Sequence, residues 1–153
     1  MGDSTIREQP WSDDAAPHGR ILVLSDNPIA RSIAAIASTV GRTVVVEAAD
    51  VGGPGLDPKA GDAVVLCDHD APDAPAVLRA ALASEASYVA MMASRGRAAG
   101  LLEDLTAEGV DVSTLHVPAG HDLGGKGPGE IALSVVAEVV AESYNRPGGP
   151  MRG

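Results

Sequence analysis

Two short stretches of the chain carry residue types that bind ligands or do chemistry. Residues 67–70, Cys-Asp-His-Asp, combine a thiol, an imidazole and two carboxylates, which are donors for transition metals or for a Cys/His nucleophile pair. Residues 120–127, GHDLGGKG, place Lys126 after three glycines and just before a predicted helix. Glycine loops at helix N-termini bind anions through backbone amides. Each stretch also has a plainer interpretation, as the end of a buried strand and as a surface loop.

Neither stretch matches a catalytic or metal-binding motif closely. The spacing of Cys67 and His69 fits no zinc pattern, even when His121 and Asp122 are added. The glycine stretch departs from the nucleotide-binding P-loop at Gly127, where a hydroxyl is needed to hold Mg²⁺. We therefore assign no metal site and no catalytic residue, and we leave open whether the protein is an enzyme.

A third stretch, residues 20–38, is typical of the strand, tight turn and helix that open a dinucleotide-binding unit. In that fingerprint, glycines let backbone amides reach a pyrophosphate at the helix N-terminus. Here Ser25 and Asn27 replace the first two glycines, Asp26 adds a negative charge, and Pro28 removes one amide. The sequence therefore predicts a turn that is kept for the fold, while binding of NAD(P) is not expected.

The elements around these stretches predict an α/β protein with a Rossmann-like three-layer fold, a mostly parallel sheet and a single domain. Apolar runs without polar alternation are typical of parallel strands covered on both faces. We expect strands at 20–24, 43–47, 62–67, 88–92 and, more weakly, 114–118. We expect helices at 28–40, 74–84, 94–108 and 129–144. The domain is expected over 19–145, with a disordered leader at 1–18 and a disordered tail at 146–153.

The composition limits the partners that the protein can have. The chain has 153 residues, 45% of them hydrophobic but only 2% aromatic, so the core must consist mainly of aliphatic residues and alanine. A net charge of −10 argues against nucleic acid and against an anionic membrane surface as partners. A single cysteine excludes an internal disulfide and, with a polar N-terminus that is unlike a signal peptide, indicates a cytoplasmic protein.

The last predicted helix carries one narrow polar stripe on an otherwise apolar surface. The stripe consists of residues four apart, namely Glu130, Ser134, Glu138 and Glu142. A stripe this narrow predicts a helix that is buried over most of its surface. Packing on the sheet accounts for part of that burial, and we expect a second subunit in a homodimer to cover the rest.

Most of the folded part, about residues 20–144, resembles the C-terminal Rossmann domain of XdhC/CoxI-type accessory proteins. The resemblance is carried by the stretches at 64–82, 88–110 and 115–141. The matching positions are His69, Asp70, Tyr88, Val89, Ser94, Arg95, Pro118, Gly120, Leu123, Gly124, Pro128, Glu130, Ile131, Ala132, Ser134, Ala137 and Glu138. The chain departs from the family pattern at Asp68, which replaces a threonine, and at Ala90 and Ala93, which replace glycines.

The resemblance implies a role in maturing xanthine dehydrogenase or carbon monoxide dehydrogenase. Family members bind the molybdenum cofactor (molybdopterin), protect it during sulfuration and deliver it to a molybdenum hydroxylase, the client enzyme. The positions that the resemblance and the strand ends together mark as cofactor-binding are Asp68, His69, Asp70, Ser94, Arg95, Gly120, Asp122, Gly124 and Lys126.

Three functions remain as alternatives at this point. The first is a non-catalytic accessory protein that binds or inserts the molybdenum cofactor. The second is an NAD(P)-binding oxidoreductase-like protein, which the replaced glycines of the first turn oppose. The third is a dimeric interaction module that binds no ligand, and the sequence does not separate it from the first.

Overall fold

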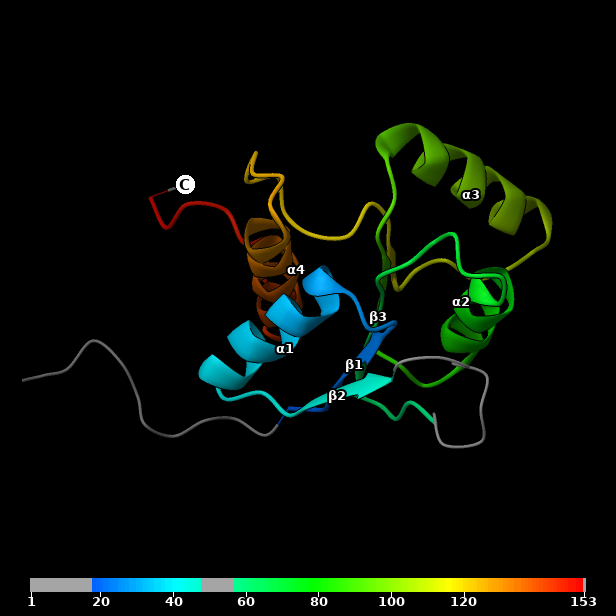
Figure 1. Ribbon diagram of the computed structural model, residues 1–153. Helices are drawn as coiled ribbons and strands as arrows, with labels where there is room; N and C mark the ends of the chain where they lie inside the picture. The colour runs from blue at the N-terminus through cyan, green and yellow to red at the C-terminus, as the bar shows by residue number, and fades with distance from the viewer. Residues whose placement is uncertain (1–17, 48–56, 153) are drawn as a thin grey trace, which may run out of the picture.

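The computed structural model describes residues 18–47 and 57–152, which form one α/β domain (Figure 1). Its elements in chain order are β1 (Ile21–Leu24), α1 (Pro28–Thr39), β2 (Val44–Glu47), β3 (Ala63–Leu66), α2 (Ala74–Ala83), β4 (Tyr88–Met91), α3 (Arg95–Ala107), β5 (Leu115–His116) and α4 (Pro128–Ser143). Each overlaps the range predicted for it. Most of the predicted leader, 1–18, lies outside the described residues.

The five strands form a single sheet in the order β2-β1-β3-β4-β5, and every described pairing is parallel. Helices α1 and α4 cover one face, and α2 and α3 cover the other (Figure 1). This arrangement confirms the predicted Rossmann-like three-layer fold. The chain moves from β1 to β2 on one side and then to β3 on the other, so the topological switch point lies between β1 and β3. Ligands of such sheets bind at the carboxyl ends of the strands near that point.

The core lies on both faces of the sheet, which explains why the strands show no polar alternation. In β1, Ile21 and Val23 point to the α1 and α4 face, while Leu22 and Leu24 point to the α2 and α3 face. On the first face small side chains such as Ala30 let α1 and α4 pack closely on the sheet and on each other. The aliphatic core expected from the composition is therefore the one observed.

The helix ends follow the local signals in the sequence. Asn27 caps α1, because its Oδ1 accepts a hydrogen bond from the Ala30 N–H at 2.9 Å, and Pro28 occupies the first helical turn. Gly41 follows the end of α1 with a φ of +82°, a backbone conformation that side chains disfavour. Among the described residues, no helix is long and apolar enough to cross a membrane.

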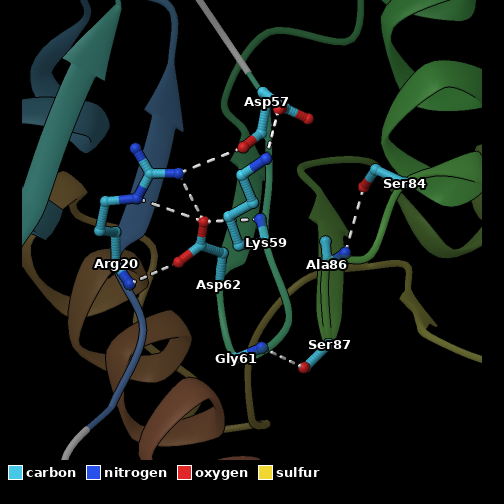
Figure 2. A network of polar contacts seen from close by, with 8 residues as sticks. All are labelled: Arg20, Asp57, Lys59, Gly61, Asp62, Ser84, Ala86 and Ser87. Carbon is cyan, nitrogen blue, oxygen red and sulfur yellow. Dashed lines mark hydrogen bonds and ion pairs between the residues drawn. The ribbon is translucent and has the colours of Figure 1, made fainter.

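A buried carboxylate, Asp62, joins the amino ends of β1 and β3 (Figure 2). It is only 3% exposed, and it accepts hydrogen bonds from the Arg20 N–H at 2.8 Å, the Arg20 guanidinium at 2.6 Å and the Lys59 N–H at 2.9 Å. Burial by itself raises the pKa of Asp62, but the hydrogen bonds from Arg20 and Lys59 outweigh it, and the net effect is a lowered pKa. The carboxylate therefore stabilises the fold in its ionised form.

We expect Asp62→Asn to lower the free energy of unfolding by about 2–3 kcal/mol, because Arg20 and two backbone amides lose their charged acceptor. The stabilisation in the wild type is present above the unfolded pKa of 3.8 and is lost as the pH falls through the lowered folded value. Urea unfolding at pH 7 and below pH 4 measures both effects. Asp57→Asn is the control, because the Asp57 side chain is 76% exposed and should contribute little.

Beyond α4 the chain turns back on itself, in the segment predicted as a disordered tail (red in Figure 1). Asn145 has a φ of +55°, and the Arg146 N–H donates to the Ala141 carbonyl at 2.9 Å. Residues up to 152 are described, and 146–150 form neither helix nor strand.

Candidate functional site

The turn between β1 and α1 keeps the backbone shape of a dinucleotide-binding turn without its glycines. Ser25 has a φ of +85°, the left-handed region that the first glycine of the fingerprint adopts. Its N–H donates to the carbonyl of Glu47 at 2.8 Å, which fixes the turn against β2. The prediction that the turn is retained as part of the fold is thus confirmed.

The side chain of Asn27 bridges the switch point itself. Its Nδ2 donates to the Cys67 carbonyl at 3.2 Å, while its Oδ1 caps α1 through the Ala30 N–H. The amide thus connects the carboxyl ends of β1 and β3 and uses one of the helix N–H groups that would otherwise hold a phosphate. A pyrophosphate at this place would have to displace Asn27, and Asp26 adds a negative charge beside it.

A cavity of about 470 Å³ lies next to the switch point, at the carboxyl end of β4. The turn between β4 and α3, the loop from 118 to 126 and the first turns of α4 enclose it. Its walls include Ile29, Met92, Ser94, Arg95, His121, Asp122, Gly124, Lys126, Ile131 and Ser134. Of the nine predicted cofactor-binding residues, the structure brings five together here, namely Ser94, Arg95, Asp122, Gly124 and Lys126.

Two cations of the cavity are available to an anionic ligand. The guanidinium of Arg95 lies 3.4 Å from the Asp122 carboxylate, but these side chains are 85% and 80% exposed, so the ion pair is weak. In the described part of the chain, Lys126 forms no ion pair with a carboxylate. The hydroxyl of Ser94 already caps α3 by accepting from the Arg97 N–H at 3.2 Å.

The residues Asp68, His69 and Asp70 form a cluster beside the cavity and do not line it. His69 donates from Nδ1 to the carbonyl of Met92, a wall residue, at 2.8 Å, and its Nε2 lies 3.4 Å from the Asp70 carboxylate. Asp70 also pairs with Arg97 at 3.2 Å. This cluster therefore supports the wall of the cavity from behind, and the interpretation of its members as ligand contacts stays a prediction.

Gly120 likewise lies outside the cavity, and the structure shows why this position is a glycine. Its φ is +97°, and a Cβ there would lie 2.3 Å from the Ser134 hydroxyl oxygen of α4. Its N–H donates to Oε1 of Glu138 at 3.1 Å. The residue thus packs the cavity loop onto α4.

The polar stripe of α4 has a different role from the one that the sequence indicated. Ser134 is 7% exposed and the Glu138 side chain 12% exposed, so the middle of the stripe faces the interior. Exposed apolar surface occurs elsewhere on the helix, at Leu133, which is 48% exposed. Sequence reasoning missed this because a polar stripe on an amphipathic helix ordinarily faces water, whereas here the loop from Gly120 covers it.

Glu138 joins three elements below the cavity. Tyr88 of β4 donates its hydroxyl to Glu138 at 2.5 Å, and the ring of Tyr88 stacks on His116 of β5 with 4.5 Å between centroids. Burial, and then the hydrogen bond to Glu138, raise the pKa of Tyr88, so the phenol remains a donor. The N–H of Gly120 shares the same carboxylate oxygen. Strands β4 and β5, the cavity loop and α4 are therefore tied together at one residue.

Cys67 has a structural position. Its side chain is buried at the end of β3, and burial raises the pKa of the thiol to about 12. A thiol in that environment is protonated at neutral pH and neither attacks a substrate nor binds a metal readily. Within residues 18–47 and 57–152, no group of three or more His, Cys, Asp or Glu side chains is arranged to hold a metal ion.

The family model described as the XdhC Rossmann domain matches residues 21–139. The chain belongs to this family. The match confirms the resemblance seen in the sequence, and it includes every wall residue of the cavity described above. Of the positions that carried the resemblance, those that line the cavity are Ser94, Arg95, Pro118, Leu123, Gly124, Ile131 and Ser134.

Two further proteins are similar to this XdhC-type domain. Over 68 residues, the chain is 37% identical to the uncharacterized protein YqeB of Escherichia coli K12. The matched region covers 42% of this chain and 13% of YqeB. A crystal structure described as a xanthine dehydrogenase from Bacillus halodurans superimposes with a TM-score of 0.73 at 21% identity. The structural match covers 86% of this chain and 44% of the other. Because the identity is low, this likeness shows the fold alone. The chain spans less than half the length of either protein.

Proposed function

We propose that this XdhC-type domain is a non-catalytic accessory protein that binds the molybdenum cofactor and presents it to a molybdenum hydroxylase. The observation that carries the proposal is the cavity at the carboxyl end of β4, whose wall residues all lie within the region that the family model matches. The solved structure with the same fold is described as a xanthine dehydrogenase, the class of client enzyme that the resemblance implies.

The residues of the cavity fit a phosphate-bearing pterin. Its volume of about 470 Å³ suits a small cofactor. Arg95 and Lys126 supply positive charge in a protein of net charge −10. Gly124 and Gly125 of the glycine loop add backbone N–H groups to the wall. Apolar walls at Ile29 and Ile131 provide a surface for a ring.

The protein's own contribution in this proposal is binding and shielding. When bound, the cofactor supplies the molybdenum chemistry that the client enzyme uses. Cys67 is buried in the core and does not line the cavity, so it is not among the residues proposed to contact the cofactor. Arg95 and Lys126 hold the phosphate, and the walls from the 118–126 loop and α4 keep water from the ring.

The direct test is titration of the purified protein with molybdenum cofactor under anaerobic conditions. A dissociation constant of about 10 µM or tighter supports the proposal. Absence of binding at cofactor concentrations around 1 mM would favour the alternative of an interaction module without a ligand. The titration should use the full 153-residue chain.

We predict that NAD(P) binds weakly or not at all. Asn27 occupies the switch point through its two hydrogen bonds, and Asp26 and Pro28 further disfavour a pyrophosphate. Calorimetric titration with NADH and NADPH should give dissociation constants weaker than about 100 µM. A value near 10 µM or tighter would instead support the oxidoreductase-like alternative.

We also propose that the protein is a homodimer that buries the outer side of α4. Leu133, Ala137 and Tyr144 follow helical spacing along this side, and Leu133 and Tyr144 are 48% and 51% exposed. An interface there would cover apolar surface that the sheet does not cover.

The dimer prediction is tested by sedimentation of wild type and Leu133→Glu at tens of micromolar. At that concentration, a dimer with a dissociation constant of about 1 µM, as expected for an interface of modest size, is mostly assembled. We expect a dimer for the wild type and a monomer for Leu133→Glu. The circular dichroism spectrum of the variant should be unchanged, because Leu133 is 48% exposed and lies outside the core. Val135 and Val139 are buried, so a charge there would damage folding instead. A monomeric wild type would contradict the proposal.

A further inference from the structure

The segment after α4 lies over a residue of the cavity. Gly148 is so close to His121 that a Cβ at this glycine would lie 2.4 Å from Nε2 of the imidazole and 3.3 Å from the Ala141 side chain. The φ of Gly148 is +80°, so both the space and the backbone conformation favour glycine here. The chain reaches this place through the turn at Asn145 and the hydrogen bond from the Arg146 N–H to the Ala141 carbonyl.

His121 itself belongs to the cavity wall but leaves one ring nitrogen without a partner. Its backbone N–H donates to the Ser134 carbonyl at 3.2 Å, which fixes the residue against α4. Its Nε2 is buried and has no hydrogen-bond partner among the described residues. A buried polar atom without a partner costs free energy, so the closed position of the chain over His121 carries an unfavourable contribution.

Little else holds this segment closed. In the described part of the chain, no hydrogen bond joins residues 147–152 to another element, and Met151 is fully exposed. A segment that buries few apolar groups and makes few hydrogen bonds to the rest of a domain opens with a small free energy. Opening also removes the cost at His121, since the freed nitrogen can then meet water or a ligand.

We propose that residues 145–152 form a strap over His121, and that release of the strap frees Nε2 of this residue to hydrogen-bond a ligand in the cavity. The ligand part rests on the proposed function, whereas the opening of the strap does not. His121 is then a ligand contact that depends on the position of the strap.

Gly148→Val should hold the strap open, and Gly149→Val is the matched control, since nothing lies within 4 Å of a Cβ at Gly149. Diethyl pyrocarbonate acylates accessible unprotonated imidazole nitrogens, and mass spectrometry of peptides reports the rate at each histidine. We expect Gly148→Val to raise the rate at His121 by about tenfold or more, which corresponds to about 1.4 kcal/mol in the opening equilibrium. The rate at His69 should not change in either variant.

An unchanged acylation rate of His121 in Gly148→Val would overturn the strap proposal. An equal rise of the His121 rate in Gly149→Val, or a parallel rise of the rate at His69, would also overturn it. Since this measurement needs no ligand, failure of cofactor binding leaves it intact. If the molybdenum cofactor binds, Gly148→Val should bind it several-fold more tightly than the wild type, by up to roughly tenfold. His121→Ala added to Gly148→Val should remove that gain, and equal affinities of the wild type and Gly148→Val would overturn the ligand part.

Discussion

Replacing Arg95 and Lys126 together by alanine is expected to weaken binding of the molybdenum cofactor by about a hundredfold or more. The two cations line the same cavity in a protein of net charge −10, so an anionic ligand has few other sources of positive charge there. A charge-assisted hydrogen bond contributes about 1.5–3 kcal/mol, and two such contacts exceed the roughly 2.7 kcal/mol of a hundredfold change. Arg95 gives up only an exposed ion pair with Asp122 to make its contact.

The control for this variant removes the same charge without touching the cavity. Arg31 pairs with Asp26, and Arg79 pairs with Glu108, and neither arginine lines the cavity. Arg31→Ala/Arg79→Ala should therefore bind the cofactor within about threefold of the wild type, because charges at that distance are largely screened by salt. Calorimetry on the three proteins at one ionic strength gives the comparison. Equal losses in both double variants would show that the cavity is not the site.

The fold was predictable because its signals are local. Strands β1 to β4 are short runs of mainly apolar residues. Asn27, Pro28 and Gly41 mark helix ends by chemistry that acts within a few residues. A parallel sheet covered on both faces needs no polar alternation, so the absence of alternation in β1 and β3 was itself informative.

The site was predictable only in part, because side-chain directions depend on packing between distant elements. Arg95 and Arg97 are two residues apart at the start of α3, yet only Arg95 lines the cavity, while Arg97 turns to Asp70. His69 matches the family motif, but its ring is directed to the Met92 carbonyl. His121 and Ser134 line the cavity as well, although neither was among the predicted cofactor-binding residues. The close approach of Gly120 to Ser134 places the loop on α4, and it joins residues that no local pattern in the sequence connects.

Replacing Glu138 by alanine is expected to lower the free energy of unfolding by about 3–4 kcal/mol. The change leaves the buried hydroxyl of Tyr88 and the N–H of Gly120 without their acceptor, at about 1–3 kcal/mol for each group, and it opens a small void between α4 and β5. Urea unfolding measures the loss. Glu142→Ala is the matched control, since this glutamate belongs to the same stripe but is exposed, and it should change stability by less than about 0.5 kcal/mol.

Glu138→Gln separates the acceptor from the charge. The amide oxygen can still accept from Tyr88 or Gly120, so we expect a smaller loss of about 1–2 kcal/mol. Tyr88→Phe should cost a similar amount, and combining it with Glu138→Ala should cost clearly less than the sum, because both remove the same hydrogen bond. Additive losses, or a Glu138→Ala protein as stable as Glu142→Ala, would contradict this role. Because Gly120 begins the cavity loop, Glu138→Ala should also weaken cofactor binding under conditions where the protein is still folded, whereas Asp62→Asn, at the opposite end of the sheet, should not.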